Sequence, residues 1–112
     1  MGDHRTVTVV RYSFRAELWL WHGQGGWHFL TLPTEVSDDI EGRTRGASRG
    51  FGSVPVAVTI GATTWRTSLF PDRKAASYVL PVKKAVRVAE QLDAGDRVEA
   101  TVELSGAARG QV

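Results

Sequence analysis

Apolar and polar residues alternate along most of this sequence, and glycine or proline interrupts the alternation at short intervals. In residues 10–21 every second position is apolar, while the positions between them are polar or charged until Trp19 and Trp21. This period of two is typical of a β-strand with one buried face. The glycine-rich residues 22–26 then predict a chain reversal into a second strand over 27–32. The residues expected on the buried face of the first strand are Tyr12, Phe14, Ala16, Leu18 and Leu20.

Four more strands and two helical segments follow from the same patterns. The strands are expected at residues 53–60, 63–70, 77–80 and 97–104. Thr34 can cap a short helical turn over about 34–41, where acids favour the positive end of the helix dipole. Apolar residues spaced three and four apart predict one α-helix over about 82–92, and a glycine–arginine loop occupies residues 42–52. Together these elements predict a mainly β fold, a small closed or nearly closed six-stranded barrel.

The chain of 112 residues is long enough for one domain. A domain of this size buries roughly two-thirds of the surface that its unfolded chain exposes, so a core can form without disulfides. We expect a flexible N-terminus over residues 1–6, a single barrel domain over 7–104 and a disordered tail over 105–112. The sequence contains no apolar run typical of a signal peptide or a membrane span, which favours a cytoplasmic location.

Ligands for metal chemistry and residues for catalysis are scarce. The sequence has no cysteine, and its three histidines are His4, His22 and His28. Two imidazoles beside the glycine-rich reversal do not supply the three protein ligands of a catalytic zinc site. The neighbouring acids Asp38 and Asp39 are expected to lie in solvent, and no motif of a hydrolase, nucleotide or metalloprotease site occurs. We therefore expect a protein that is not an enzyme and that needs no metal or cofactor.

Three of the four tryptophans lie around the first expected hairpin. Trp19 and Trp21 occupy the face of their strand opposite the apolar one, and Trp27 and His28 follow the glycine-rich reversal. One interpretation is that these rings fill the core and close one end of the barrel. The other is that the four residues form a platform for a protein or small-molecule ligand, which would make the domain a binding or interaction module.

Positive charge is concentrated in the middle of the chain. The formal net charge is only +2, yet residues 42–87 contain nine lysines or arginines and a single acid, Asp72. If the fold brought the basic loop and the basic helix face together, they would form a patch suited to phosphates and to weak electrostatic binding of nucleic acid. The alternative is that they are solvated charges balanced by the acidic segments on either side. The candidate residues are Arg43, Arg45, Arg49, Lys83, Lys84 and Arg87.

Several short motifs occur in a fixed order over about residues 10–104. They include Gly26-Trp27-x-Phe29-x-x-Leu32-Pro33, Gly52-Ser53-Val54-Pro55-Val56 and Tyr78-x-Leu80-Pro81-Val82-Lys83-Lys84. This series closely resembles the domain of unknown function 1905 family. The resemblance implies a small six-stranded barrel of the double-split kind and implies no particular activity. The last third, with its strand, helix, tight turn and strand, also resembles half of a swapped-hairpin AbrB-like domain.

Overall fold

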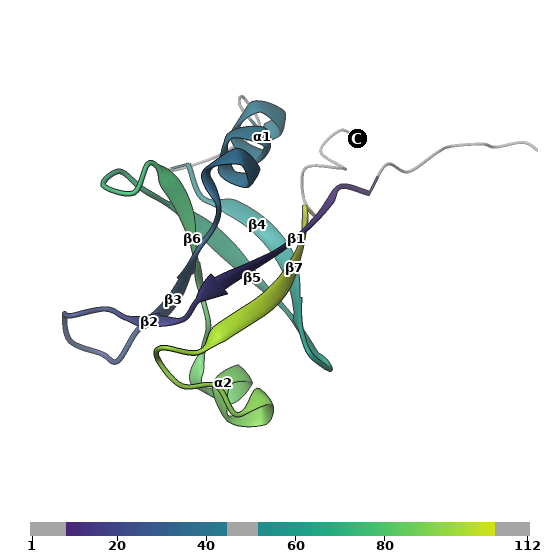
Figure 1. Ribbon diagram of the computed structural model, residues 1–112. Helices are drawn as coiled ribbons and strands as arrows, with labels where there is room; N and C mark the ends of the chain where they lie inside the picture. Colours follow the sequence, from purple (N-terminus) through teal and green to yellow (C-terminus); the bar gives the residue numbers. More distant parts are fainter. Residues whose placement is uncertain (1–8, 45–51, 105–112) are drawn as a thin grey trace, which may run out of the picture.

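The computed structural model describes residues 9–44 and 52–104, which form seven strands and two helices (Figure 1). In chain order these are β1 (Arg11–Glu17), β2 (Trp19–Leu20), β3 (His28–Thr31), α1 (Thr34–Thr44), β4 (Val54–Ile60), β5 (Thr63–Asp72), β6 (Ser77–Pro81), α2 (Lys84–Glu90) and β7 (Arg97–Leu104). The mainly β fold predicted from the alternation is confirmed. The expected N-terminal segment 1–6 and tail 105–112 lie outside the described residues.

All seven strands belong to one antiparallel sheet with the order β1-β7-β4-β5-β6-β3-β2. The sheet curls into a half-barrel, and its two edge strands, β1 and β2, are consecutive segments separated only by Leu18. The predicted first strand therefore runs from one edge of the sheet to the other, and its division at Leu18 gives seven strands instead of six. Backbone hydrogen bonds hold the junction, because the Leu18 N–H donates to the Asp96 carbonyl (2.9 Å) and the Leu18 carbonyl accepts from Gly95 (2.7 Å).

The interior of the half-barrel is filled by apolar side chains from the inner faces of the strands. Leu18, Leu69 and Val102 are completely buried, as the alternation requires. The expectation for Leu20 is wrong, since 46% of this residue is exposed. It lies on the edge strand β2, opposite His28, where the sheet ends and no further strand covers it.

The first helix is longer than predicted. It begins at Thr34 but continues to Thr44, three residues beyond the predicted end at about residue 41, and residues 45–51 of the expected loop lie outside the described residues. Its last turn is held by an ion pair between Arg43 and Asp39, and the Thr44 hydroxyl donates to the Ile40 carbonyl (2.8 Å). These contacts extend the helix through Gly42, a residue that usually weakens helices.

The second helix is shorter than predicted. Pro81 ends β6, and the Val82 N–H donates to the His28 carbonyl (3.0 Å), so the chain continues its pairing with β3 before α2 begins. The helix ends where Gln91 adopts a left-handed conformation (φ 57°). Arg87 was expected on the solvent side but is half-buried, with its Nε donating to the Val82 carbonyl (3.1 Å). Within the described parts of the chain, neither helix has the length and apolarity needed to cross a bilayer.

Candidate binding cleft

The β2–β3 hairpin presents two tryptophans on a glycine-rich loop. Trp21 and Trp27 face each other across the turn, and the Trp21 N–H donates to the Trp27 carbonyl (2.8 Å). The rings lie against loop backbone that has no side chain, because a Cβ at Gly23 would collide with the Trp21 ring and one at Gly25 would lie 3.0 Å from the Trp27 ring. The two residues remain 45% and 53% exposed, so the loop holds them at the surface.

Trp19 has a different role from its neighbours. Its indole N–H donates to the Thr31 hydroxyl (2.9 Å), and its ring packs on Phe29 with centroids 5.2 Å apart. It is half-buried, which fits packing of the sheet better than display to a ligand. Phe29 also stacks on Trp27, with centroids 6.1 Å apart and ring planes 10° apart.

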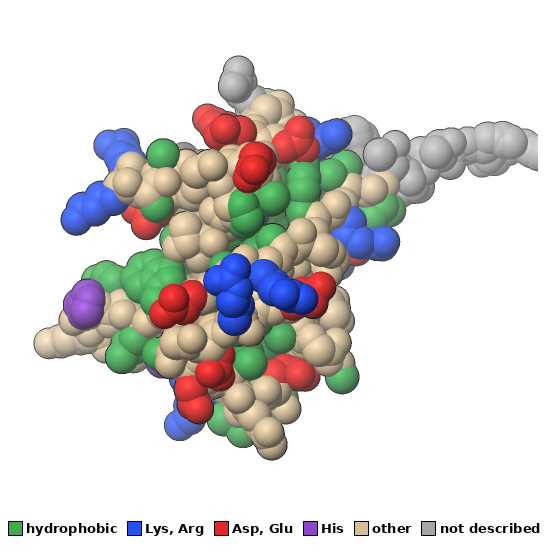
Figure 2. Space-filling view, viewed as in Figure 1, with side chains coloured by type: hydrophobic (Ala, Val, Ile, Leu, Met, Phe, Trp, Pro, Cys, Tyr) green, Lys and Arg blue, Asp and Glu red, His purple; other side chains and the backbone are tan. Residues whose placement is uncertain are grey.

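The exposed rings border an apolar hollow of about 320 Å³ on the outer face of β3, β5 and β6. Figure 2 shows hydrophobic side chains gathered beside the β2–β3 hairpin, with a histidine at their edge. Phe70 of β5 is 44% exposed here and pairs with Val79 of β6. The residues that line the hollow are Trp21, Trp27, Phe29, Phe70 and Val79.

A larger cleft of about 430 Å³ adjoins this hollow and shares Trp27 and Phe70 with it. The loop before β3, with His28, forms one side of the cleft, and β5 contributes Trp65, Arg66 and Thr67. The opposite side is formed by Lys83, which precedes α2, and by Lys84 and Arg87 of α2 itself. The aromatic hairpin and the basic helix face, which the sequence suggested as two alternative sites, thus line the same cleft.

Among the described residues, four cationic side chains and no carboxylate line this cleft: Arg66, Lys83, Lys84 and Arg87. Within residues 9–44 and 52–104, none of the four takes part in an ion pair. On the β1–β7 face, by contrast, Arg11 pairs with Glu103 (3.6 Å) and Arg15 with Glu99 (3.8 Å), and Figure 2 shows basic and acidic side chains interleaved there. The cleft therefore carries positive charge that the described fold does not neutralise.

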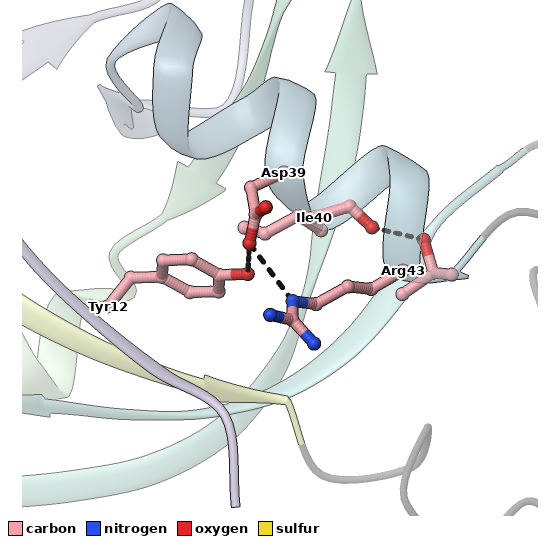
Figure 3. Close-up of polar contacts among 5 residues, drawn as sticks. Tyr12, Asp39, Ile40 and Arg43 are labelled. Atoms are coloured by element: carbon pink, nitrogen blue, oxygen red, sulfur yellow. Dashed lines mark hydrogen bonds and ion pairs between the residues drawn. The ribbon is translucent and has the colours of Figure 1, made fainter.

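Arg43 does not join this group. It lies on α1, at the opposite end of the half-barrel from α2 (Figure 1), and its Nε donates to Asp39 (3.0 Å). The Tyr12 hydroxyl donates to the same carboxylate oxygen, which links β1 to α1 (Figure 3). Arg45 and Arg49 lie outside the described residues. The basic loop-plus-helix patch is therefore not assembled as predicted among the described residues, because Arg43 and the α2 cations lie at opposite ends of the fold.

The contacts around Asp39 shift three pKa values. The hydrogen bond to Asp39, followed by that to Tyr12, raises the pKa of Arg43. The hydrogen bond from Tyr12, followed by that from Arg43, lowers the pKa of the Asp39 carboxyl. Partial burial, with the hydrogen bond to Asp39, raises the pKa of Tyr12. The acids of α1 are otherwise exposed, as the sequence indicated for Asp38 and Asp39.

We expect Asp39→Asn to flatten the acid limb of the stability profile. Because the folded-state pKa of Asp39 is lowered, its contribution is present above the ordinary carboxyl pKa of about 3.9 and is lost as pH falls through the folded-state value. Thermal unfolding between about pH 2 and pH 7 tests this. Asp38→Asn, one residue away and without these partners, should retain the wild-type slope. An unchanged slope in Asp39→Asn would show that the Tyr12–Asp39–Arg43 contact does not contribute.

His28 borders the cleft with a fixed ring orientation. Its Nδ1 lies 2.8 Å from the Gly26 carbonyl, which accepts a hydrogen bond from that nitrogen. Among the described residues, no group of three or more histidine, aspartate or glutamate side chains lies close enough to hold a metal ion. Sequence reasoning missed Arg66 and Phe70. Both lie on the exposed positions of the alternating β5 pattern, and only the path of α2 and the hairpin brings these positions into the site.

The fold and cleft define a small, mainly β domain with a groove where its curled sheet lies beside a helix. The chain belongs to the family described as Domain of unknown function (DUF1905), whose model matches residues 14–102. The resemblance drawn from the sequence motifs is thereby confirmed. A search of curated proteins finds no match. The likeness of the last third to an AbrB-like half is not borne out, since β6 pairs with β3 and β5 whereas β7 pairs with β1 and β4.

Proposed function

We propose that this domain is a non-enzymatic binding module whose cleft takes an anionic ligand with an attached aromatic or apolar group. The single observation that carries the proposal is the continuity of the two hollows. Trp27 and Phe70 belong both to the apolar hollow and to the cleft, whose four cations form no ion pair with any described residue. A ligand with both properties would contact the rings and the cations at once.

Each half of such a ligand has a physical reason to bind. An aromatic ring that packs on Trp27 or Phe70 buries apolar surface of these residues that is exposed in the free protein. This burial favours binding, and the contacts between the rings favour it further. Phosphate or carboxylate oxygens near Lys83, Lys84 and Arg87 accept charge-assisted hydrogen bonds, which are stronger than neutral ones. The cleft volume of about 430 Å³ lies in the range of small-molecule sites.

The chemistry of the lining supports binding over catalysis. No carboxylate lines the cleft, and His28 is the one imidazole among the described residues that does. Its Nδ1 is engaged by the Gly26 carbonyl, and the neighbouring side chains are rings and cations. A general acid or base must lie within hydrogen-bond reach of the proton that it transfers, and among the described residues the lining offers no carboxylate for that role. The cytoplasmic location expected from the sequence stays a prediction.

A titration with 1-naphthyl phosphate, followed through the indole N–H signals of the four tryptophans, tests the proposal. Inorganic phosphate provides the anion alone, and 1-naphthol provides the ring alone. We expect naphthyl phosphate to bind at least about tenfold more tightly than either control, because it gains both sets of contacts. Binding that naphthol matches would contradict the role of the cations, and no saturable binding at millimolar ligand would contradict the proposal as a whole.

Electrostatic binding of nucleic acid is the second function suggested by the sequence. Arg43 lies away from the cleft and in an ion pair, so among the described residues the patch on which that idea rested is reduced to Lys83, Lys84 and Arg87. The remaining cations lie beside exposed rings, an arrangement also used to bind single strands. A single-stranded oligonucleotide is therefore included as a competitor in the experiment below.

A further inference from the structure

The cleft coincides with an open edge in the sheet. β5 pairs with β4 over residues 63–69, whereas its pairing with β6 covers only Phe70, Pro71 and Asp72. Beyond Val79, β6 turns away and continues its pairing with β3 through Leu80 and Pro81. On the side opposite β4, no described residue forms a backbone–backbone hydrogen bond with residues 63–69.

The register identifies the backbone groups at this edge. Ile60 and Thr63 flank a two-residue turn and form the first pair of the β4–β5 hairpin. Hydrogen-bonded pairs alternate with non-hydrogen-bonded pairs in an antiparallel ladder. The alternation directs the N–H and C=O groups of Thr64, Arg66 and Ser68 away from β4. The short contact between the hydroxyls of Thr59 and Thr64 (2.9 Å) is typical of a non-hydrogen-bonded pair.

The cleft lies against this edge. The cleft is lined by three consecutive residues of β5, Trp65, Arg66 and Thr67. Because the side chains of consecutive strand residues point to opposite faces of the sheet, the cleft must lie beside the edge of the strand and not over one face. α2 is anchored at the start of β5, where the Glu90 carboxylate accepts hydrogen bonds from the Thr63 hydroxyl (2.6 Å) and the Ala62 N–H (3.2 Å). Lys84 and Arg87 of this helix face the cleft across from β5.

We propose that the occupant of this cleft is an extended acidic peptide that adds to the open edge of β5 as a further strand. The proposal rests on the binding function proposed above and names the partner of the same site. Seven residues of open edge span about 20 Å, enough to pair with a short strand. Main-chain hydrogen bonds to such an edge supply affinity, and side-chain contacts supply specificity. Acidic side chains of the peptide meet the four cations of the cleft, and its apolar side chains meet Phe70 and Trp27.

Charge selects this occupant over a second copy of the chain. Pairing two copies edge to edge would bring Arg66 and the α2 cations of both molecules together, and like charges at such distances repel. The carboxylates of an acidic strand would instead attract these same cations. A single-stranded nucleic acid would use the cations and rings but would leave the N–H and C=O groups of the β5 edge unpaired.

Amide hydrogen exchange of the whole protein, measured with and without peptide, tests the edge directly. The probe is a peptide of about seven residues in which one alternate set of positions carries glutamates and, at one end, valine, with threonine at the positions between them. Both kinds of side chain then lie on the face of the added strand that matches Arg66 and Phe70, and the control peptide replaces each glutamate with lysine. In the free protein we expect the amides of Thr64, Arg66 and Ser68 to exchange faster than those of Trp65 and Thr67, which pair with β4. The acidic peptide should slow exchange at the first three by at least about tenfold, and the lysine peptide should not.

Two versions of the acidic peptide, N-methylated on alternate residues, distinguish strand addition from contact through side chains. In an added strand only one alternate set of amides faces β5. Methylation of that set should therefore weaken binding by at least about tenfold, while methylation of the other set should change it by less than about twofold.

Equal effects of the two versions would overturn the proposal, as would an oligothymidylate that binds more tightly than the peptide. Concentration-dependent dimerisation that protects the same amides without peptide would also overturn it. If naphthyl phosphate binds in the cleft and the acidic peptide does not, the peptide inference fails and the anion-binding function stands; if neither binds, both fail.

Discussion

Leu18→Ala is expected to lower the free energy of unfolding by about 3–4 kcal/mol, a large part of the stability of a domain of this size. Leu18 is completely buried and lies where the chain passes from one edge of the sheet to the other. Removing its side chain leaves a cavity at the junction. The backbone of Leu18 is also hydrogen-bonded there to Gly95 and Asp96. The loss of stability therefore includes both the lost burial of the leucine side chain and the cost of the cavity that remains at the junction between β1 and β2.

Urea unfolding followed by circular dichroism measures this loss. Leu20→Ala is the matched control, since it makes the same chemical change two residues further along. Leu20 is 46% exposed, so we expect its truncation to cost less than about 1 kcal/mol. Similar losses in the two variants would contradict the assignment of Leu18 as the buried junction.

The double variant Lys83→Glu/Lys84→Glu is expected to raise the Kd for 1-naphthyl phosphate by at least about tenfold at low salt. Both side chains are exposed, and both line the cleft. The change replaces two attractive charges with two repulsive ones, and salt should weaken the effect because these groups face solvent. Fold stability should change little, since neither lysine has an ion-pair partner among the described residues to lose.

Arg73→Glu/Lys74→Glu is the matched control for this variant. These residues form an adjacent, exposed basic pair in the turn between β5 and β6 and do not line the cleft. The control changes the net charge of the protein by the same amount. Equal loss of affinity in the two variants would indicate a general charge effect and would contradict a site at α2.

The sequence predicts the strands of this domain well because most of them bury only one face. Alternation in residues 97–104 and 54–60 corresponds to alternating burial in β7 and β4. The pattern does not reveal which part of a strand lies at the edge of the sheet, so Leu20 was expected to be buried. Local signals also misplace the helix ends, because the pairing of Val82 with His28 delays α2 and the contacts of Asp39 and Thr44 extend α1.

The candidate site was predictable only in parts. Trp27 and His28 were singled out from the hairpin, and Lys83 and Lys84 from the helix face, as members of two alternative sites. About fifty-five residues separate these segments, and their meeting depends on the pairing of β3 with β6, which is a long-range feature. Arg66 carried no distinguishing signal, because an exposed arginine in a strand is common in any sheet protein. Arg43 was grouped with the α2 cations because both lie in the basic middle of the chain, residues 42–87, yet its i,i+4 spacing to Asp39 indicates the ion pair that it forms.

The most direct test of a shared aromatic and cationic cleft is a map of intermolecular nuclear Overhauser effects in the complex with 1-naphthyl phosphate. We predict contacts from the naphthyl protons to the rings of Trp27 and Phe70, together with amide shift changes at Lys83 and Lys84. Trp19, which packs on Phe29 and donates to Thr31, should show no such contact. Naphthyl contacts confined to α1, or shift changes that do not include Lys83 and Lys84, would contradict the account.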